Sequence, residues 1–235
     1  MREAALITGA SDRLGKAIAL ALAGAGYNIA LHYNNSEFKA YQTRDLIKSK
    51  NVDCETFKAD LSSKAACISL MSSVCKKFDI RVLVNNASIF VPDKLTDSND
   101  QLFDELFRTN FMAPFLLTRE FARHSEDGLI INLLDTNIRK NKTTHFSYLL
   151  FKKFLAVFTT MSALELAPGI RVNGIAPGLI LPPEGKDNSY LERLAVRIPL
   201  KKSGEPKNIS DTVLFLIKNE FLTGQIIHID GGENL

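Results

Sequence analysis

The stretch Thr8-Gly9-Ala10-Ser11-Asp12-Arg13-Leu14-Gly15 decides the fold, because it directly follows a short apolar segment at residues 4–7. A glycine such as Gly9 permits a tight turn after a strand, and one such as Gly15 permits close packing of the following helix on that strand. The free backbone amides at the start of the helix can bind a phosphate group. The stretch therefore predicts a phosphate-binding turn between a first strand and a first helix.

Short apolar runs alternate with segments of helical periodicity along the whole chain. Several runs, 128–134 among them, are almost purely apolar, which is typical of strands that are buried on both faces of a sheet. The repeating order predicts an α/β fold, namely a single-domain Rossmann-type, doubly wound parallel sheet of about seven strands with helices on both faces. The expected strands are 4–7, 28–33, 54–59, 80–85, 128–134, 170–176 and 225–230. The expected helices are roughly 12–25, 37–49, 63–77, 100–123, 147–166 and 206–219.

The 235 residues, 46% of them hydrophobic, are enough for one large domain with a buried core. No linker, repeat or low-complexity stretch interrupts them, so we expect a single domain over 1–235. The irregular exception is the polar stretch 181–197, which contains proline and glycine. We expect this insertion near a sheet edge to form a substrate lid.

Composition and charge argue against several classes of protein. A net charge of +3, evenly spread, does not favour nucleic acid as a partner. No apolar segment is long enough to span a membrane and no secretory signal is visible, which predicts a cytoplasmic protein with no membrane partner. The three cysteines, Cys54, Cys67 and Cys75, show no metal-ligand spacing, so we expect buried free thiols and no metal site.

Two segments bear on the choice of cofactor. A dinucleotide-binding loop generally has glycine where Arg13 stands, and an arginine there could bind a phosphate through its side chain. The alternative is a solvated arginine at the start of a helix. After the second strand, Tyr33-Asn34-Asn35-Ser36 offers no acidic residue for ribose hydroxyls, and its neutral donors would tolerate a 2′-phosphate that a carboxylate would repel. These features predict NADP(H), although the same polar turn can also serve as a helix cap.

Tyr148 and Lys152 are four residues apart in a segment of helical character, so they share one helix face. A free tyrosine has a pKa of about 10, and a nearby ammonium stabilises the phenolate and lowers that pKa. Tyr148 could then donate a proton to a carbonyl or imine as hydride arrives. The pair occurs often by chance, so it does not identify a function by itself.

Three further motifs follow strands of the predicted sheet: Asp60-Leu61-Ser62, Asn85-Asn86-Ala87-Ser88 and Asn173-Gly174-Ile175-Ala176-Pro177-Gly178. Ligands of such sheets bind at these carboxyl ends. With the glycine turn and the Tyr148–Lys152 pair, the motifs make essentially the whole chain resemble the short-chain dehydrogenase/reductase family. The resemblance implies that Tyr148 is the catalytic acid, that Lys152 holds the nicotinamide ribose, and that Asn110 organises a proton-relay water. It also implies cofactor contacts at Gly9, Ser11, Arg13, Leu14, Gly15, Asp60, Leu61, Asn86, Ala87, Ser88, Tyr148, Lys152, Pro177, Gly178 and Leu179.

One position departs from the usual pattern of that family. The family usually has serine thirteen residues before its tyrosine, and this chain has Asp135 there. Together with Arg13 and Phe90, this aspartate resembles the pteridine reductase branch. That resemblance implies that Phe90 stacks on a pterin, and Asp135 accepts hydrogen bonds from pterin donors better than a serine would. The alternatives are an Asp135 that caps the following turn, with Thr136 in the role of the serine, and a Phe90 in the core. The implied substrate contacts are Ser88, Phe90, Asp135, Tyr148 and Leu179.

The leading hypothesis is NADPH-dependent reduction of a dihydropterin, with a dihydromonapterin-, dihydrobiopterin- or dihydrofolate-like substrate. The alternative enzyme is a carbonyl reductase such as a 3-oxoacyl-thioester reductase, against which Asp135 argues. A non-catalytic NADP-binding sensor is a third hypothesis, against which the presence of Tyr148, Lys152 and Asn110 argues. The resemblance also implies a homotetramer that associates through the helices expected at 100–123 and 147–166; the alternative is that their apolar residues fill the monomer core.

Overall fold

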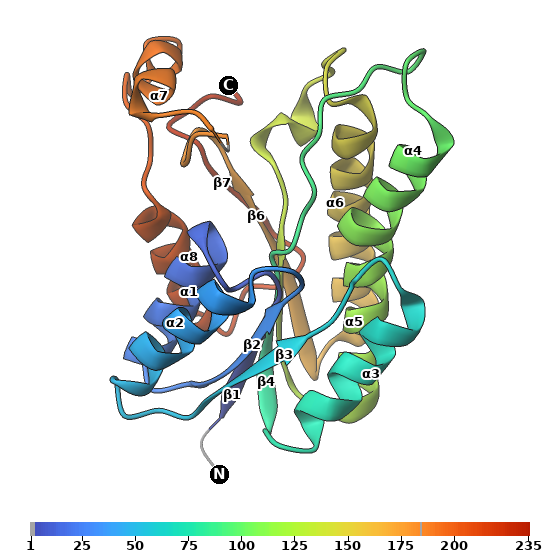
Figure 1. The fold of residues 1–235 in the computed structure, drawn as a ribbon, viewed down its shortest axis with the longest axis vertical. Helices are drawn as coiled ribbons and strands as arrows, with labels where there is room; N and C mark the ends of the chain where they lie inside the picture. Colours follow the sequence, from blue (N-terminus) through green and yellow to red (C-terminus); the bar gives the residue numbers. More distant parts are fainter. Residues whose placement is uncertain (1–2, 184) are drawn as a thin grey trace.

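The computed structural model describes residues 3–183 and 185–235, and in these residues seven strands form one parallel sheet (Figure 1). The order across the sheet is β3-β2-β1-β4-β5-β6-β7, so the direction of winding reverses between β1 and β4. Ligands of open α/β sheets bind at such a reversal, outside the carboxyl ends of the strands. The strands are β1 (Ala4–Ile7), β2 (Asn28–Tyr33), β3 (Cys54–Lys58), β4 (Ile80–Asn85), β5 (Gly128–Leu133), β6 (Ile170–Pro177) and β7 (Ile226–Ile229).

Helices cover both faces of the sheet (Figure 1). One face carries α1 (Arg13–Gly24), α2 (Glu37–Lys48) and α8 (Pro206–Lys218). The other face carries α3 (Lys64–Cys75), α4 (Asp100–Phe107), α5 (Ala113–His124) and α6 (Phe146–Leu166). The predicted doubly wound, Rossmann-type fold is therefore confirmed, and each predicted strand end agrees with the observed one to within a residue.

The strands are apolar because both faces of the sheet are buried. In β1, Ala5 and Ile7 pack in the core cluster that includes α1 and α8, whereas Ala4 and Leu6 pack in the cluster that includes α3 and α5. Successive side chains of a strand point to opposite faces, so all four β1 side chains are removed from solvent. This two-sided burial fixes the strands, and it thereby fixes the polar residues that follow their carboxyl ends.

The helix predicted over 100–123 is interrupted. Residues Arg108–Met112 form a π-helical turn between α4 and α5, and Pro114 stands at the start of α5. Proline has no N–H, so it cannot donate to the carbonyl four residues earlier, which is that of Asn110. The π turn accommodates this missing bond, and such turns are frequent at functional sites. The Asn110 side chain is buried.

The sequence analysis predicted an irregular stretch at 181–197, but the structure has a helix in part of it. It contains α7 (Asn188–Ala195), which Asp187 caps by accepting a hydrogen bond from the Ser189 backbone N–H at 3.1 Å. Leu191 and Ala195 are buried, so the short helix has an apolar face. Figure 1 places α7 beside the C-terminal end of the chain, beyond the carboxyl ends of β6 and β7. The interpretation of this stretch as a substrate lid stays a proposal.

Among the helices in the described residues, none combines the length and the apolar character that a membrane crossing needs. Cys54 and Cys67 are buried, Cys75 is half-buried, and all three are free thiols.

Candidate active site

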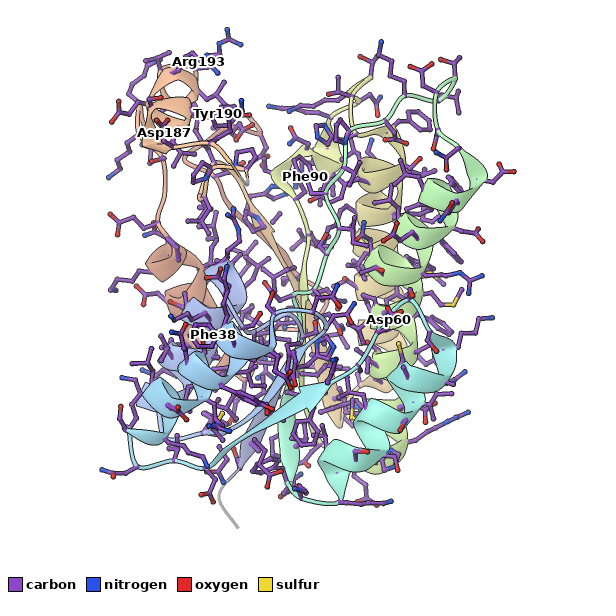
Figure 2. All side chains as sticks on the ribbon, in the orientation of Figure 1. Phe38, Asp60, Phe90, Asp187, Tyr190 and Arg193 are labelled. Atoms are coloured by element: carbon purple, nitrogen blue, oxygen red, sulfur yellow. The ribbon has the colours of Figure 1, made fainter. Side chains whose placement is uncertain are left out.

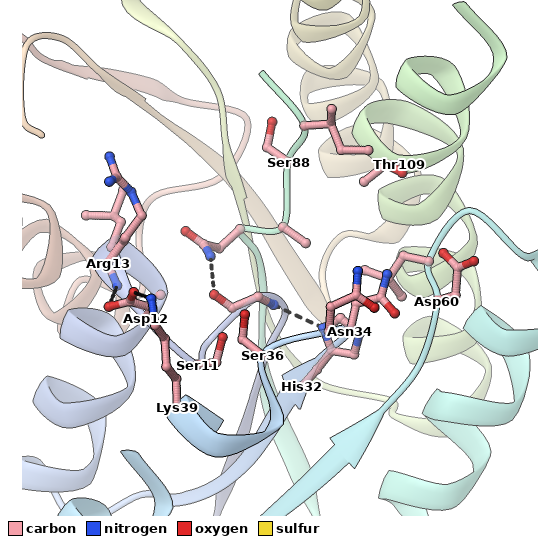
Figure 3. A pocket seen from close by; sticks show the side chains of 18 of the residues that line it. Ser11, Asp12, Arg13, His32, Asn34, Ser36, Lys39, Asp60, Ser88 and Thr109 are labelled. Carbon is pink, nitrogen blue, oxygen red and sulfur yellow. Dashed lines mark hydrogen bonds and ion pairs between the residues drawn. The ribbon is translucent and has the colours of Figure 1, made fainter. Parts of the chain in front are cut away.

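A cavity of about 920 Å³, the cofactor cavity, lies at the start of α1 and the carboxyl ends of β2, β3 and β4 (Figure 3). Tyr33 does not line it, because its side chain is buried and its hydroxyl donates to Glu37 Oε1 at 2.9 Å. Alternate residues of a strand point to opposite faces, and it is His32 that faces the cavity. The other residues predicted to bind the phosphates and the adenosine all line it: Gly9, Ser11, Arg13, Leu14, Gly15, Asn34, Asn35, Ser36, Asp60, Leu61, Asn86, Ala87 and Ser88.

The glycine turn has the backbone that the sequence predicts. Gly9 has a φ of +63°, and a Cβ there would lie 3.1 Å from the Ala87 Cα. A Cβ on Gly15 would overlap the Gly9 carbonyl oxygen, so the helix can approach the turn this closely only with glycine. Arg13 has a φ of +52°, in the left-handed region that favours glycine, which agrees with its place at a position where glycine is usual.

The Arg13 side chain joins the turn to the segment before α7. Its Nη2 donates to the Pro182 carbonyl at 2.6 Å, and the exposed guanidinium lines the cofactor cavity (Figure 3). A guanidinium carries five N–H donors, so the bond to Pro182 leaves others for a phosphate. Asp12 accepts from the Arg13 backbone N–H at 2.7 Å and pairs with Lys39 Nζ at 2.6 Å. Lys39, which was not predicted, is therefore a second cation beside the cavity.

Two polar side chains that were not predicted hold the turn in place. His32 is buried; its Nδ1 accepts from the Gly9 N–H at 3.0 Å, and its Nε2 donates to the Ala59 carbonyl at 3.0 Å. These bonds require a neutral imidazole with its hydrogen on Nε2, and burial lowers the pKa of His32 to about 4. Thr8 Oγ1 accepts from the Asn86 N–H at 2.9 Å. The ends of β1, β2, β3 and β4 are thus tied together around the cavity.

A second cavity of about 490 Å³, the reaction cavity, adjoins the cofactor cavity, because Pro183 lines both. The Tyr148 hydroxyl donates to Asp135 Oδ2 at 3.0 Å in this cavity. The structure therefore brings together a proton donor from α6 and a carboxylate from the end of β5. The predicted residues that line the reaction cavity are Phe90, Asp135, Tyr148, Pro177, Gly178 and Leu179.

The surroundings of Tyr148 raise its pKa, whereas the sequence analysis expected Lys152 to lower it. Burial is the main cause, and Asp135 adds to it through its charge and its hydrogen bond. Lys152 is buried, its Nζ donates to the Leu133 carbonyl at 2.7 Å, and Nζ lies 5.7 Å from the centre of the Tyr148 ring. Burial lowers the pKa of Lys152 to about 8, against the opposite effect of Asp135. The expectation for Tyr148 was therefore wrong for this structure, and its phenol stays protonated at neutral pH.

Asp135 both caps the turn that follows it and contacts Tyr148 in the reaction cavity. Its Oδ1 accepts from the Asn137 backbone N–H at 2.7 Å and from Asn137 Nδ2 at 2.8 Å, so it caps the 3₁₀ turn η2 (Thr136–Arg139). Its Oδ2 is turned toward Tyr148. The Thr136 hydroxyl donates to the buried Asp230 instead, so this hydroxyl is not placed as a substitute for the family's serine.

Asn110 fixes the segment that follows β4. Its Oδ1 accepts from the Ile89 N–H at 2.8 Å and from the Ser88 hydroxyl at 3.0 Å, and its Nδ2 donates to the Ile89 carbonyl at 2.9 Å. These bonds orient Ser88 in the cofactor cavity and the neighbouring Phe90 in the reaction cavity. The role of Asn110 in a proton relay stays a prediction.

Phe90 is not a core residue, because 51% of its surface is exposed and it lines the reaction cavity. Figure 2 shows it between α7 and α6. Its ring lies parallel to the His145 imidazole, with ring centres 4.1 Å apart, and edge-to-face with Tyr148 at 4.7 Å. His145, which was not predicted, has a left-handed backbone with a φ of +56° at the start of α6. The three rings together form one aromatic wall of the reaction cavity.

Comparison with known proteins gives similarity over nearly the full length of the chain. Residues 9–234 match the model of the family described as enoyl-(acyl carrier protein) reductase. The 3-oxoacyl-(acyl-carrier-protein) reductase FabG of Staphylococcus epidermidis is 34% identical over 242 residues, which cover 99% of this chain and 99% of that protein. The solved structure of FolM alternative dihydrofolate reductase 1 from Brucella canis, complexed with NADP, is 33% identical with a TM-score of 0.92, over 99% of this chain and 94% of that one. Its counterpart from Brucella suis, also with NADP, is 34% identical with a TM-score of 0.93, over 98% and 94%.

Proposed function

Because the chain belongs to the short-chain dehydrogenase/reductase family of oxidoreductases, we propose that it reduces a dihydropterin, with NADP(H) as the cofactor that supplies the hydride. The observation that carries the proposal is the Asp135 carboxylate 3.0 Å from the Tyr148 hydroxyl, with Phe90 in the same cavity. Reduction of a C=N bond adds a hydride to carbon and a proton to nitrogen, so the site must deliver one proton.

The cofactor cavity has the groups that a phosphorylated dinucleotide needs. The amides at the start of α1 and the Arg13 guanidinium would hold the pyrophosphate. The turn Asn34-Asn35-Ser36 would face the ribose phosphate with neutral donors, and Lys39, which is paired with Asp12, lies beside it.

Asp135 would select the substrate ring. Pterins present ring N–H and amino donors, and an ionised carboxylate accepts such hydrogen bonds more strongly than a hydroxyl does. The same negative charge would repel the oxygen of a ketone. Asn137 holds Oδ1, so Oδ2 is the oxygen that remains for the substrate and Tyr148.

Tyr148 would deliver the proton from its Oη. Its raised pKa keeps the phenol protonated at neutral pH, so the proton is present when the substrate needs it. The Lys152 ammonium would stabilise the phenolate that remains after the transfer. Because the pKa of Lys152 is about 8, this ammonium is present at neutral pH and is lost in alkaline solution.

Phe90 would pack on the flat heterocycle. One face of the ring is covered by His145, and half of the side chain's surface stays exposed to the cavity. Offset stacking of aromatic rings contributes about 0.5–1.5 kcal/mol beyond the burial of their area. The similarity to the Brucella alternative dihydrofolate reductases supports this use of the site.

The second candidate function is reduction of a 3-oxoacyl thioester. The similarity to the Staphylococcus epidermidis FabG favours it. The Asp135 carboxylate disfavours reduction of a 3-oxoacyl thioester, because the oxygen of the reacting ketone would lie close to a negative charge.

A substrate panel tests these functions. NADPH absorbance is followed with purified protein and, separately, dihydromonapterin, dihydrobiopterin, dihydrofolate and an acetoacetyl thioester. We expect turnover with at least one dihydropterin and none with the thioester. Turnover with the thioester alone would reject the proposal in favour of the second candidate. NADPH binding without turnover of any substrate would favour a cofactor-binding sensor.

We also propose that the protein forms a homotetramer through α4, α5 and α6. Phe151 fills the core, but a row of apolar side chains on these helices is exposed, up to 85% at Leu164. Burial of such surface favours association. Light scattering should give a mass four times that of the chain, and the double variant Met161→Glu/Leu164→Glu should give smaller species. A wild-type monomer would contradict the proposal. The exposed apolar side chains are Phe103, Phe115, Phe154, Val157, Met161 and Leu164.

A further inference from the structure

A third cavity, of about 310 Å³, adjoins the reaction cavity, because Lys142, Leu179, Leu194 and Glu233 line both. We call it the basic annex. We propose that it binds an anionic tail of the substrate, a carboxylate or a phosphate, while the reacting ring occupies the reaction cavity. The inference rests on the proposed function and deepens it, because it selects substrates that carry such a tail.

Three cations converge on the basic annex. Lys140 and Lys142 lie in the segment between η2 and α6, and Arg197 follows α7. Lys140 and Lys142 are near neighbours in the sequence, and the fold brings Arg197 against them from a distant part of the chain. One carboxylate, that of Glu233, also lines the annex, so positive charge predominates in it.

Within residues 3–183 and 185–235, none of these cations forms an ion pair with a carboxylate, although Lys142 and Lys140 lie close enough to Glu233 to act on its charge. In the part of the chain that the structure describes, the side chains of Lys142 and Arg197 make no hydrogen bond and no ion pair. Lys140 Nζ donates to the backbone carbonyl of Glu233, which leaves its charge without a carboxylate partner. By contrast, Lys39 and Lys207 are each paired with an aspartate. The annex therefore keeps cationic groups that an anionic ligand can engage.

The charges of the connected cavities are ordered from the reaction cavity outward. Glu233 lies at the inner end, since its Oε2 is 3.1 Å from the point where a Cβ on Gly178 would lie. Burial raises the pKa of Glu233, Lys142 and Lys140 oppose this, and Asp135 adds to it. Asp135 lines the reaction cavity alone, Glu233 and Lys142 line both cavities, and Lys140 and Arg197 line the annex alone. This arrangement suits a substrate with hydrogen-bond donors on its ring and negative charge on its tail.

The residues that line the annex indicate what chemical groups the rest of the tail would contain. Leu179 and Leu194 line both cavities and Ile198 lines the annex, so apolar surface continues from the reaction cavity into the annex beside the cations. A tail with an apolar portion followed by an anion matches this sequence of surfaces. Among dihydropterins, dihydrofolate has such a tail, with an aromatic ring and terminal carboxylates, whereas dihydrobiopterin has a short neutral side chain. The pantetheine arm of a thioester would offer a phosphate to the same cations.

The test compares two substrates in the double variant Lys142→Gln/Arg197→Gln. Pairs of partly exposed charges contribute little each, so we expect the loss of both to lower the ratio of kcat/KM for dihydrofolate to that for dihydrobiopterin by about two- to 25-fold. The fall should lie in the KM for dihydrofolate, and the charge-retaining variant Lys142→Arg/Arg197→Lys should restore most of the ratio. The matched control is Lys50→Gln/Lys76→Gln, two exposed lysines at the amino edge of the sheet, which should leave the ratio unchanged.

The outcomes separate this inference from the proposed function. If both dihydropterins are reduced and the ratio does not move, or moves equally in the control variant, the annex is not a tail site although the proposed function stands. If only thioesters are reduced, the proposed function fails. The annex is then tested with acetoacetyl-coenzyme A against a phosphate-free acetoacetyl thioester. A selective rise in the KM of the phosphate-bearing substrate supports the annex, and equal effects on both overturn it.

Discussion

Replacement of Asp135 by asparagine would remove the negative charge beside Tyr148 while it keeps the size of the side chain and an acceptor for Asn137. A hydrogen bond to a charged group contributes about 1.5–3 kcal/mol, and each 1.36 kcal/mol, roughly, changes a rate tenfold. If Oδ2 of Asp135 accepts from the pterin, kcat/KM for a dihydropterin should fall about 10- to 150-fold in Asp135→Asn.

The same substitution should move the alkaline limb of the pH profile. The Asp135 charge raises the pKa of both Tyr148 and Lys152, so its removal lowers both values. Wild-type activity that needs the Lys152 ammonium should be lost as pH rises through about 8, and in Asp135→Asn this loss should occur at lower pH.

The assay is the initial rate of NADPH oxidation with dihydrobiopterin from mildly acidic to alkaline pH. Asp211→Asn, which removes an exposed carboxylate from α8, is the control for a change in net charge. A thermal melt of each variant separates loss of the site from loss of the fold. The reasoning is refuted if kcat/KM of Asp135→Asn stays within about twofold of wild type and the alkaline limb does not move.

Three further substitutions probe separate parts of the site. Tyr148→Phe should lower kcat at least about 100-fold while NADPH binding, measured by fluorescence, is retained, because only the proton donor is removed; near-normal turnover would assign the proton to another group. His32→Ala leaves the partly buried Gly9 N–H without its acceptor, so calorimetry should show a loss of about 1–3 kcal/mol in stability and a weaker affinity for NADPH; unchanged affinity would mean that the turn holds its shape without His32. Phe90→Leu should raise the KM for a dihydropterin about two- to tenfold with little change in kcat, and an equal rise in the KM for NADPH would argue against stacking on the substrate.

The fold could be predicted because its strands are buried on both sides. The apolar run over β5 and the glycine turn at Gly9–Gly15 each have one consistent structural interpretation. The interruption at Asn110 had a visible signal in Pro114, whose missing N–H prevents a continuous α-helix. The sequence signal for the helix α7 was weaker, because this helix is short and follows a segment rich in proline and glycine.

The residues that contact the reaction cavity, such as Asp135 and Tyr148, could be identified from the sequence. The residues that hold the site in its shape could not. Asp135 and Tyr148 are thirteen residues apart, and only the packing of α6 beside β5 brings Oδ2 within 3.0 Å of the hydroxyl. His32 looks like any polar residue at the end of a strand until Gly9 and Ala59 are seen on either side of it. Tyr33 was predicted to contact the cofactor, and only the structure shows that alternation along β2 turns its side chain away from the cavity.

The pKa of Tyr148 also depended on tertiary structure. The spacing of Tyr148 and Lys152 suggested a lowered pKa, but burial raises the pKa of Tyr148, and the charge and hydrogen bond of Asp135 raise it further. Burial is a property of the packed fold, and the sequence pattern around Tyr148 does not contain it.

The central claim is that Asp135 and Phe90 make this reductase a pterin enzyme, and a crystal structure of the ternary complex with NADP⁺ and a bound pterin tests it most directly. The account predicts a pterin nitrogen within hydrogen-bond distance of Asp135 Oδ2, with the heterocycle parallel to the Phe90 ring in the reaction cavity. A pterin whose ring donors point away from Asp135, or whose ring does not pack on Phe90, would contradict it.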